Sequence, residues 1–128
     1  MLGSADAQAT IPVKDINRAK AFYEQVLGLK PIVGSMPQVQ AYRAGGSCLL
    51  VYVSEFAGTN QATAVTWSLG NEFDTTVQGL KAKGVDFKTY PIPGATMDGP
   101  VHVMGELRVA WFADPDGNII NLGNYPAP

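Results

Sequence analysis

The chain has 128 residues, of which 46% are hydrophobic and 16% charged, and its formal net charge is −2 at pH 7. This balance predicts one globular domain, and the lack of a basic run argues against partners such as nucleic acid or an acidic membrane. No stretch approaches the roughly 18 apolar residues of a membrane helix, and no signal-peptide pattern is visible, so we expect a cytoplasmic protein.

The first half of the chain predicts a strand, a helix and three further strands. Residues 9–14 have strand composition, and Asp15 then takes the N-cap position of a helix over 16–27, where apolar residues recur with helical spacing. Gly28 follows this helix as a stop signal. The three later strands are predicted at 30–34, 38–44 and 47–54.

The second half repeats this order after a linker at 55–61. A strand is predicted at 62–69, with Asn71 as the N-cap of a second helix and Gly84 as its stop. Between them, the apolar residues Phe73, Val77 and Leu80 recur at the intervals typical of a helix. The strands that follow are predicted at 85–90, 106–113 and 118–123.

The two halves superpose when one is shifted by about 56 residues, a spacing that places Asp15 on Asn71 and Gly28 on Gly84. A strand–helix–three-strand unit cannot cover both faces of its own sheet. We therefore predict an α+β fold of two βαβββ modules, about 8–55 and 61–124, with helices on the outer faces and the sheets curving around a shared cleft.

A turn is predicted between the last two strands, at residues 114–117. Asp114, Pro115 and Gly117 occupy positions i, i+1 and i+3 of a type I turn. Asp114 and Asp116 are candidate catalytic carboxylates, or their side chains bond nearby backbone amides within the turn.

Two segments together resemble the vicinal oxygen chelate superfamily. They are IPVKDINRAKAFYEQVLGLKPI at 11–32 and VAWFADPDGNIINLGNY at 109–125. This superfamily includes glyoxalases, extradiol dioxygenases, fosfomycin-resistance enzymes and bleomycin-binding resistance proteins. The resemblance implies the same paired βαβββ fold and a homodimer.

The resemblance also implies four strand positions at which the metalloenzymes of the family hold a divalent cation with His, Glu or Gln. Carried over to this chain, these positions fall at Gln8, near Val51, near Ala64 and at Asn121. Valine and alanine supply no ligand, and the two amides are weak neutral donors. We therefore expect no metal and no other cofactor.

Strand alternation extends this set of residues facing the cleft. If the four positions point inward, Thr10, Leu49 and Thr66 should do so too, while Trp67 should face the helix. Tyr42 and Trp111 lie on strands near the cleft, with their facing left open. The predicted ligand-binding residues are Gln8, Thr10, Tyr42, Leu49, Val51, Ala64, Thr66, His102, Trp111 and Asn121.

His102 lies in a stretch without clear periodicity, residues 91–105. The stretch is either a lid or binding loop, or a surface excursion or dimer contact. His102 itself is either a ligand contact or general base, or a solvated or simply hydrogen-bonded loop residue.

The leading functional hypothesis is a homodimeric binding protein that holds an apolar or aromatic small molecule without metal, for example to sequester an antibiotic. The alternative is a glyoxalase-like or dioxygenase-like lyase or isomerase, either metal-dependent or using a cleft carboxylate such as Glu106. No catalytic residue is assigned. A third hypothesis is an accessory interaction module.

Overall fold

In the computed structural model, which describes residues 1–33 and 36–126, the chain forms two compact units. The first comprises residues 1–61 and 114–118, and the second comprises 62–113 and the chain from 119 onward. The first unit extends beyond the expected module at 8–55 at both ends. The turn at 114–118 also belongs to this unit, although it falls within the expected module at 61–124 and the strands on either side of it belong to the second unit.

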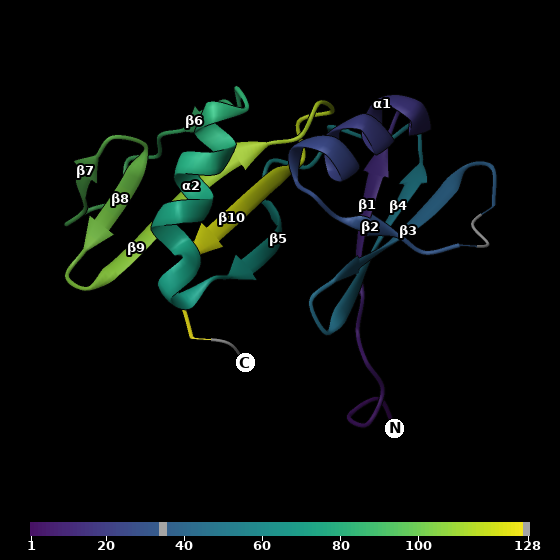
Figure 1. Cartoon of the computed structure of the whole chain (residues 1–128), viewed down its shortest axis with the longest axis horizontal. Helices are drawn as coiled ribbons and strands as arrows, with labels where there is room; N and C mark the ends of the chain where they lie inside the picture. Colours follow the sequence, from purple (N-terminus) through teal and green to yellow (C-terminus); the bar gives the residue numbers. More distant parts are fainter. Residues whose placement is uncertain (34–35, 127–128) are drawn as a thin grey trace. The chain divides into compact units, whose positions relative to one another are not determined.

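The first unit has the expected βαβββ order (Figure 1). Its sheet has the strand order β1-β4-β3-β2, in which β1 runs parallel to β4, and α1 packs on β3 and β4. The elements are β1 (Ala9–Val13), α1 (Ile16–Lys20), the π-helix η1 (Ala21–Val26), β2 (Lys30–Pro31), β3 (Val39–Ala44) and β4 (Ser47–Val53).

The first helix begins and ends as the sequence predicts. The Asp15 carboxylate accepts hydrogen bonds from the backbone N–H groups of Asn17 (2.9 Å) and Arg18 (3.3 Å), which confirms the N-cap. Gly28 follows the helix with φ +75°, a conformation that favours glycine. The helix widens after Lys20 into a π-helix, with the Leu27 N–H bonded to the Phe22 carbonyl.

The core of the first unit lies between this helix and one face of its sheet, which we call the helix-covered face. The Tyr42 hydroxyl donates to Glu24 Oε2 of η1 at 2.8 Å, and its ring stacks on Tyr23. Directly paired residues share a face, and Leu49 pairs with Tyr42 while Val51 pairs with Ile11. All of these side chains except Glu24 are fully or almost fully buried.

This packing decides the facing of Tyr42, which the sequence left open, and corrects the predicted facing of Leu49 and Val51. Thr10 pairs with Leu50, so Thr10 lies on the opposite, helix-free face of the first sheet. The prediction that Leu49 and Val51 share a face with Thr10 is therefore wrong. The pairing is offset by one residue from the expected one, and a one-residue offset moves every side chain of a strand to the other face.

The second unit repeats the βαβββ order with an additional hairpin (Figure 1). Its sheet has the order β5-β10-β9-β8-β7, with β6 paired to β9 and with β5 parallel to β10. The elements are β5 (Thr63–Ser68), the 3-10 helix η2 (Gly70–Glu72), α2 (Phe73–Ala82), β6 (Phe87–Lys88), β7 (Thr96–Asp98), β8 (Val101–Met104), β9 (Leu107–Ala113) and β10 (Ile119–Gly123).

Two predictions for the second unit are wrong. Asn71 does not cap α2, because a 3-10 turn over Gly70–Glu72 precedes the helix and Glu72 takes the N-cap position without a side-chain bond. The stretch 91–105 is not irregular throughout, because β7 and β8 form a hairpin closed by the two-residue turn at Gly99 and Pro100.

The turn at 114–118 has the expected structural role for Asp114. Its Oδ1 accepts from the backbone N–H groups of Asp116 (2.9 Å) and Asn118 (2.8 Å), and the Gly117 N–H bonds the Asp114 carbonyl at 3.0 Å. Its Oδ2 accepts from Tyr23 Oη and from Asn118 Nδ2, each at 2.7 Å. Asn118 Nδ2 also donates to the Pro12 carbonyl, so the turn is bonded to both β1 and η1.

None of the helices in the described part of the chain is long and apolar enough to span a membrane. The α+β fold with two mixed sheets matches the sequence-based expectation.

Candidate functional site

Four of the predicted site residues share one face of the second sheet. Asn121 pairs directly with Trp111 on β9 and with Thr66 on β5, so the three side chains lie on the same face. His102 joins them, because its ring packs against the Trp111 ring. We call this the helix-free face of the second sheet.

Helix α2 covers the opposite face. Arg108, whose side chain alternates with those of Val109 and Trp111 along β9, bonds Asp74 of α2 through Nε at 3.1 Å. Trp67 pairs with Leu122, which places its side chain on the α2 side, as predicted. The facing of Trp111, which the sequence left open, is thereby decided in favour of the helix-free face.

Asn121 is buried, and both ends of its amide are bonded. Its Oδ1 accepts from the Tyr125 hydroxyl at 3.2 Å, and its Nδ2 donates to the Ala110 carbonyl at 3.2 Å and to the Leu122 carbonyl at 3.4 Å. The Tyr125 ring lies against Gly123, where a β-carbon would overlap it. The amide oxygen at this family ligand position is therefore neutral and already engaged.

Trp111 is the centre of an aromatic cluster, defined here as Trp111, Tyr90 and His102. The Tyr90 ring meets it edge-on with centroids 5.4 Å apart, and the His102 ring does so at 5.0 Å. The indole Nε1 donates to Thr63 Oγ1 at 3.3 Å, which fixes the ring on the sheet. The cluster supplies an aromatic surface on the same face of the sheet as the Thr66 hydroxyl and the Asn121 amide.

His102 does not lie in an exposed loop, as one reading of the sequence had it. It lies on β8, its side chain is 0% exposed, and its Nε2 accepts from the Tyr90 backbone N–H at 3.0 Å. Among the described residues, its Nδ1 is the one buried side-chain nitrogen or oxygen without a hydrogen-bond partner. Leaving such a group unsatisfied costs about 1–3 kcal/mol.

Three other predicted ligand-binding residues are exposed and lie outside the aromatic cluster. Gln8 is exposed and directly precedes β1, Thr10 is exposed on the first sheet, and Ala64 is exposed where the β5–β10 register shifts. The helix-free face of the first sheet carries Leu50 and Tyr52 in place of Leu49 and Val51. These two residues were not predicted, because alternation within one strand does not reveal which of its two sides faces the helix.

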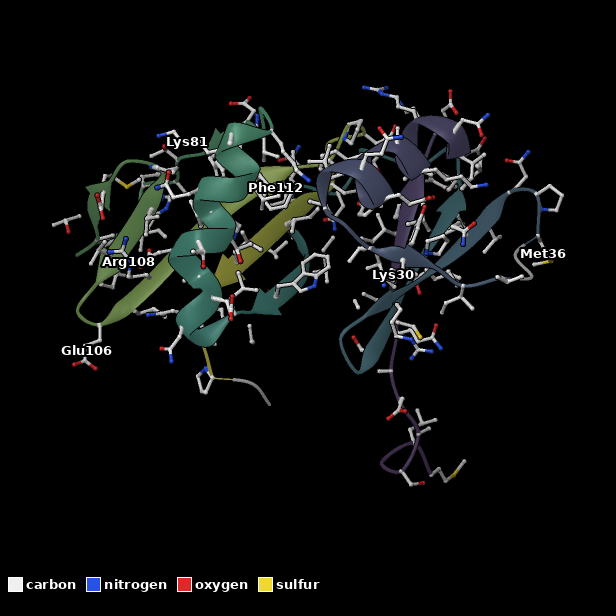
Figure 2. All side chains as sticks on the ribbon, viewed as in Figure 1. Lys30, Met36, Lys81, Glu106, Arg108 and Phe112 are labelled. Carbon is white, nitrogen blue, oxygen red and sulfur yellow. The ribbon has the colours of Figure 1, made fainter. Side chains whose placement is uncertain are left out.

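Of the charged residues near the candidate site, Lys88 pairs with Trp111 across the sheet and bonds Asp86, whereas Arg108 and Glu106 are directed elsewhere. Hydrogen bonds to Asp98, and then the charge of Asp74, raise the pKa of the Arg108 guanidinium, which points to the α2 side of the sheet. Glu106 lies exposed in the β8–β9 turn and points away from the sheet (Figure 2). Neither Arg108 nor Glu106 supplies a buried carboxylate or a cation on the helix-free face.

The residues present do not fit the divalent metal that the family fold implies. In the described part of the chain, no group of three or more His, Cys, Asp or Glu side chains could hold an ion. In the second unit the two family positions carry a methyl group, Ala64, and the engaged amide of Asn121. In the first unit they carry Gln8 and the core residue Val51, and neither Leu50 nor Tyr52 beside Val51 supplies a carboxylate or imidazole.

Comparison with known proteins agrees with the architecture. Two successive βαβββ units, each with its first strand parallel to its last, define a protein of the vicinal oxygen chelate class. The family model of the Glyoxalase/Bleomycin resistance protein/Dioxygenase superfamily matches residues 7–122, and the chain belongs to this superfamily. None of the curated proteins matches the sequence significantly.

Solved structures share the fold at low sequence identity. The fosfomycin resistance protein FosX from Listeria monocytogenes, complexed with Mn(II) and sulfate, is 20% identical with a TM-score of 0.72, over 98% of this chain and 93% of that chain. FosX from Mesorhizobium loti is 17% identical with a TM-score of 0.68, over 98% of this chain and 95% of that chain. A lactoylglutathione lyase from Agrobacterium tumefaciens is 17% identical with a TM-score of 0.66, over 94% of this chain and 92% of that chain.

Proposed function

We propose that the chain is a small-molecule binding protein that holds a planar aromatic or apolar ligand on the helix-free face of the second sheet without a metal ion. The observation that carries the proposal is Asn121, whose amide occupies a family metal position with its oxygen bonded to Tyr125. A neutral, engaged amide offers little to a divalent cation.

The chemistry of the neighbouring side chains supports an organic ligand. Trp111 offers a flat surface, held by its bond to Thr63, on which a planar ring can stack. Thr66 adds a hydroxyl and Asn121 an amide, and the charge of Lys88, which pairs with Trp111 on this face, is balanced by Asp86. Affinity then comes from burial of ligand surface, at roughly 25 cal/mol per Å², and from stacking.

The test is a fluorescence titration with a panel of aromatic natural products and antibiotics. The Trp67→Phe variant reports on Trp111 alone, and the matched Trp111→Phe variant reports on Trp67, which lies on the α2 side. We expect saturable quenching in wild type and Trp67→Phe, and loss of both signal and affinity in Trp111→Phe. Saturable binding that leaves Trp111 fluorescence unchanged would place the ligand elsewhere and refute the proposal.

The alternative is a metal-dependent lyase or isomerase, and the specific observation in its favour is the Mn(II) of the FosX structure that shares this fold. Calorimetric titration of the chelator-treated protein with Mn(II), Zn(II) and Ni(II) separates the two functions. We expect no stoichiometric binding and no change of ligand affinity with EDTA. A stoichiometric metal site would reverse the ranking.

The proposal includes the oligomeric state of the protein and its role in the cell. As in the family resemblance, we propose a homodimer, and light scattering coupled to gel filtration measures its mass directly. Sequestration of an antibiotic in the cytoplasm would make the protein a resistance factor. Its expression in a sensitive host should raise the tolerated dose of the bound compound but not of an unbound one.

A further inference from the structure

The buried imidazole of His102 has one nitrogen whose purpose the fold does not explain. Its Nε2 accepts the Tyr90 N–H, so in a neutral imidazole the proton resides on Nδ1. That N–H is a buried donor without a partner among the described residues. Buried donors are nearly always paired, so an unpaired one indicates a missing acceptor.

The residues around His102 indicate what kind of molecule could supply that acceptor. The nearest ring is Trp111, perpendicular to the imidazole at 88°, and the second ring of the cluster is Tyr90. The residues paired with His102 across the sheet are Val109 and Met97, neither of which carries a charge or a side-chain oxygen. The acceptor is therefore expected on the same molecule that uses the aromatic surface.

We propose that His102 is a specificity-determining residue, whose Nδ1–H donates to an acceptor oxygen on a planar ring that stacks on Trp111. The ligand class is an aromatic carboxylate, carboxamide or ketone. This inference rests on the proposed function, since it assumes that Trp111 contacts the ligand, and it adds the polar group by which ligands are selected.

Access to Nδ1 requires a local displacement, because this atom has no exposed surface in the structure. The Tyr90 ring is half-buried and packs on Trp111, and it belongs to the connection between β6 and β7, residues 89–95. A ligand ring that takes the place of the Tyr90 ring retains the aromatic contact. The backbone bond from Tyr90 to Nε2 can persist meanwhile and keeps the proton on Nδ1.

The premise is tested first in the free protein. His102 is the sole histidine in the sequence, so a long-range ¹H–¹⁵N spectrum reports it without ambiguity. We expect a protonated Nδ1 and an unprotonated Nε2. A proton on Nε2 would overturn the inference before any ligand is added.

The second test uses benzoate and benzamide, which carry an acceptor oxygen on the ring, and benzylammonium, which carries a donor in its place. We expect the first two to shift the His102 Nδ1 proton and to bind about tenfold more tightly than the third. His102→Met is the matched variant, because a thioether sulfur can still weakly accept the Tyr90 N–H while no side-chain donor remains. It should bind benzamide and benzylammonium with similar affinity, and His102→Phe should do the same if the methionine variant does not fold.

The remaining outcomes each decide the matter. If the probes quench Trp111 but leave the His102 resonance unmoved, or if His102→Met keeps the discrimination, the inference fails and the proposed function stands. If benzoate and benzamide do not bind at all, the inference fails, and the broader ligand panel decides the proposed function separately.

Discussion

The bond between the Tyr23 hydroxyl and the Asp114 carboxylate gives a prediction with a distinctive pH signature. Both residues are buried, their oxygens lie 2.7 Å apart, and Asp114 organises the turn at 114–118. Tyr23→Phe removes one hydrogen bond to a charged acceptor without changing the volume of the ring. The expected loss in the free energy of unfolding at neutral pH is about 2 kcal/mol.

The size of this loss should depend on pH in a direction that the structure fixes. Burial first, and the nearby Asp114 carboxylate second, raise the pKa of Tyr23 far above its usual value of 10.0. The stabilisation is complete below about pH 10 and falls as pH rises further, because the unfolded chain releases the tyrosine proton while the folded chain retains it. The slope for one such group approaches about 1.4 kcal/mol per pH unit.

Wild type and Tyr23→Phe should therefore converge in stability between neutral pH and about pH 11.5. Urea denaturation followed by circular dichroism at several pH values measures this, with Tyr52→Phe on the helix-free face of the first sheet as a matched control. Tyr42, whose pKa is also raised by burial and by Glu24, leaves an alkaline slope in both proteins and cancels in the difference. A stability gap that is constant or widens above pH 10 would refute the reasoning.

Three further substitutions test local features by denaturation of the same kind. Asp15→Ala should cost about 1 kcal/mol through loss of the helix cap, whereas Asp15→Asn should retain most of the stability. Gly58→Ala should cost more than about 1 kcal/mol, because φ is +78° and the new β-carbon would meet the Asp116 carbonyl; Gly46→Ala, with open space, is the control. Asn121→Ala should cost about 1–3 kcal/mol by leaving the Tyr125 hydroxyl and the Ala110 carbonyl without this partner; equal stability would contradict the assigned bonds.

Residues that cap or end a helix, or form a turn, determined much of the fold. Asp15 capped its helix, Gly28 ended it, and the 114–117 turn formed as predicted, because each depends on hydrogen bonds between residues close in the chain. The repeated order of elements then led to two βαβββ units and to the superfamily. The β7–β8 hairpin had a local signal too, the glycine at the start of its two-residue turn, and the 56-residue comparison obscured it because the first unit has no counterpart.

The tertiary structure alone decided which way the site residues face. Leu49 and Leu50 are equally apolar, and only the pairing of β4 with β1 and β3, together with the helix packed on one side, assigns one of them to the core. His102 looked like an isolated loop residue because its bonding partners, Tyr90 and Trp111, are distant along the chain or on another strand. Helix caps and turns depend on residues that are close together in the chain, so the sequence predicts them. The side of the sheet on which a residue lies, and the burial of its side chain, depend on pairing between distant strands, which a single sequence does not reveal.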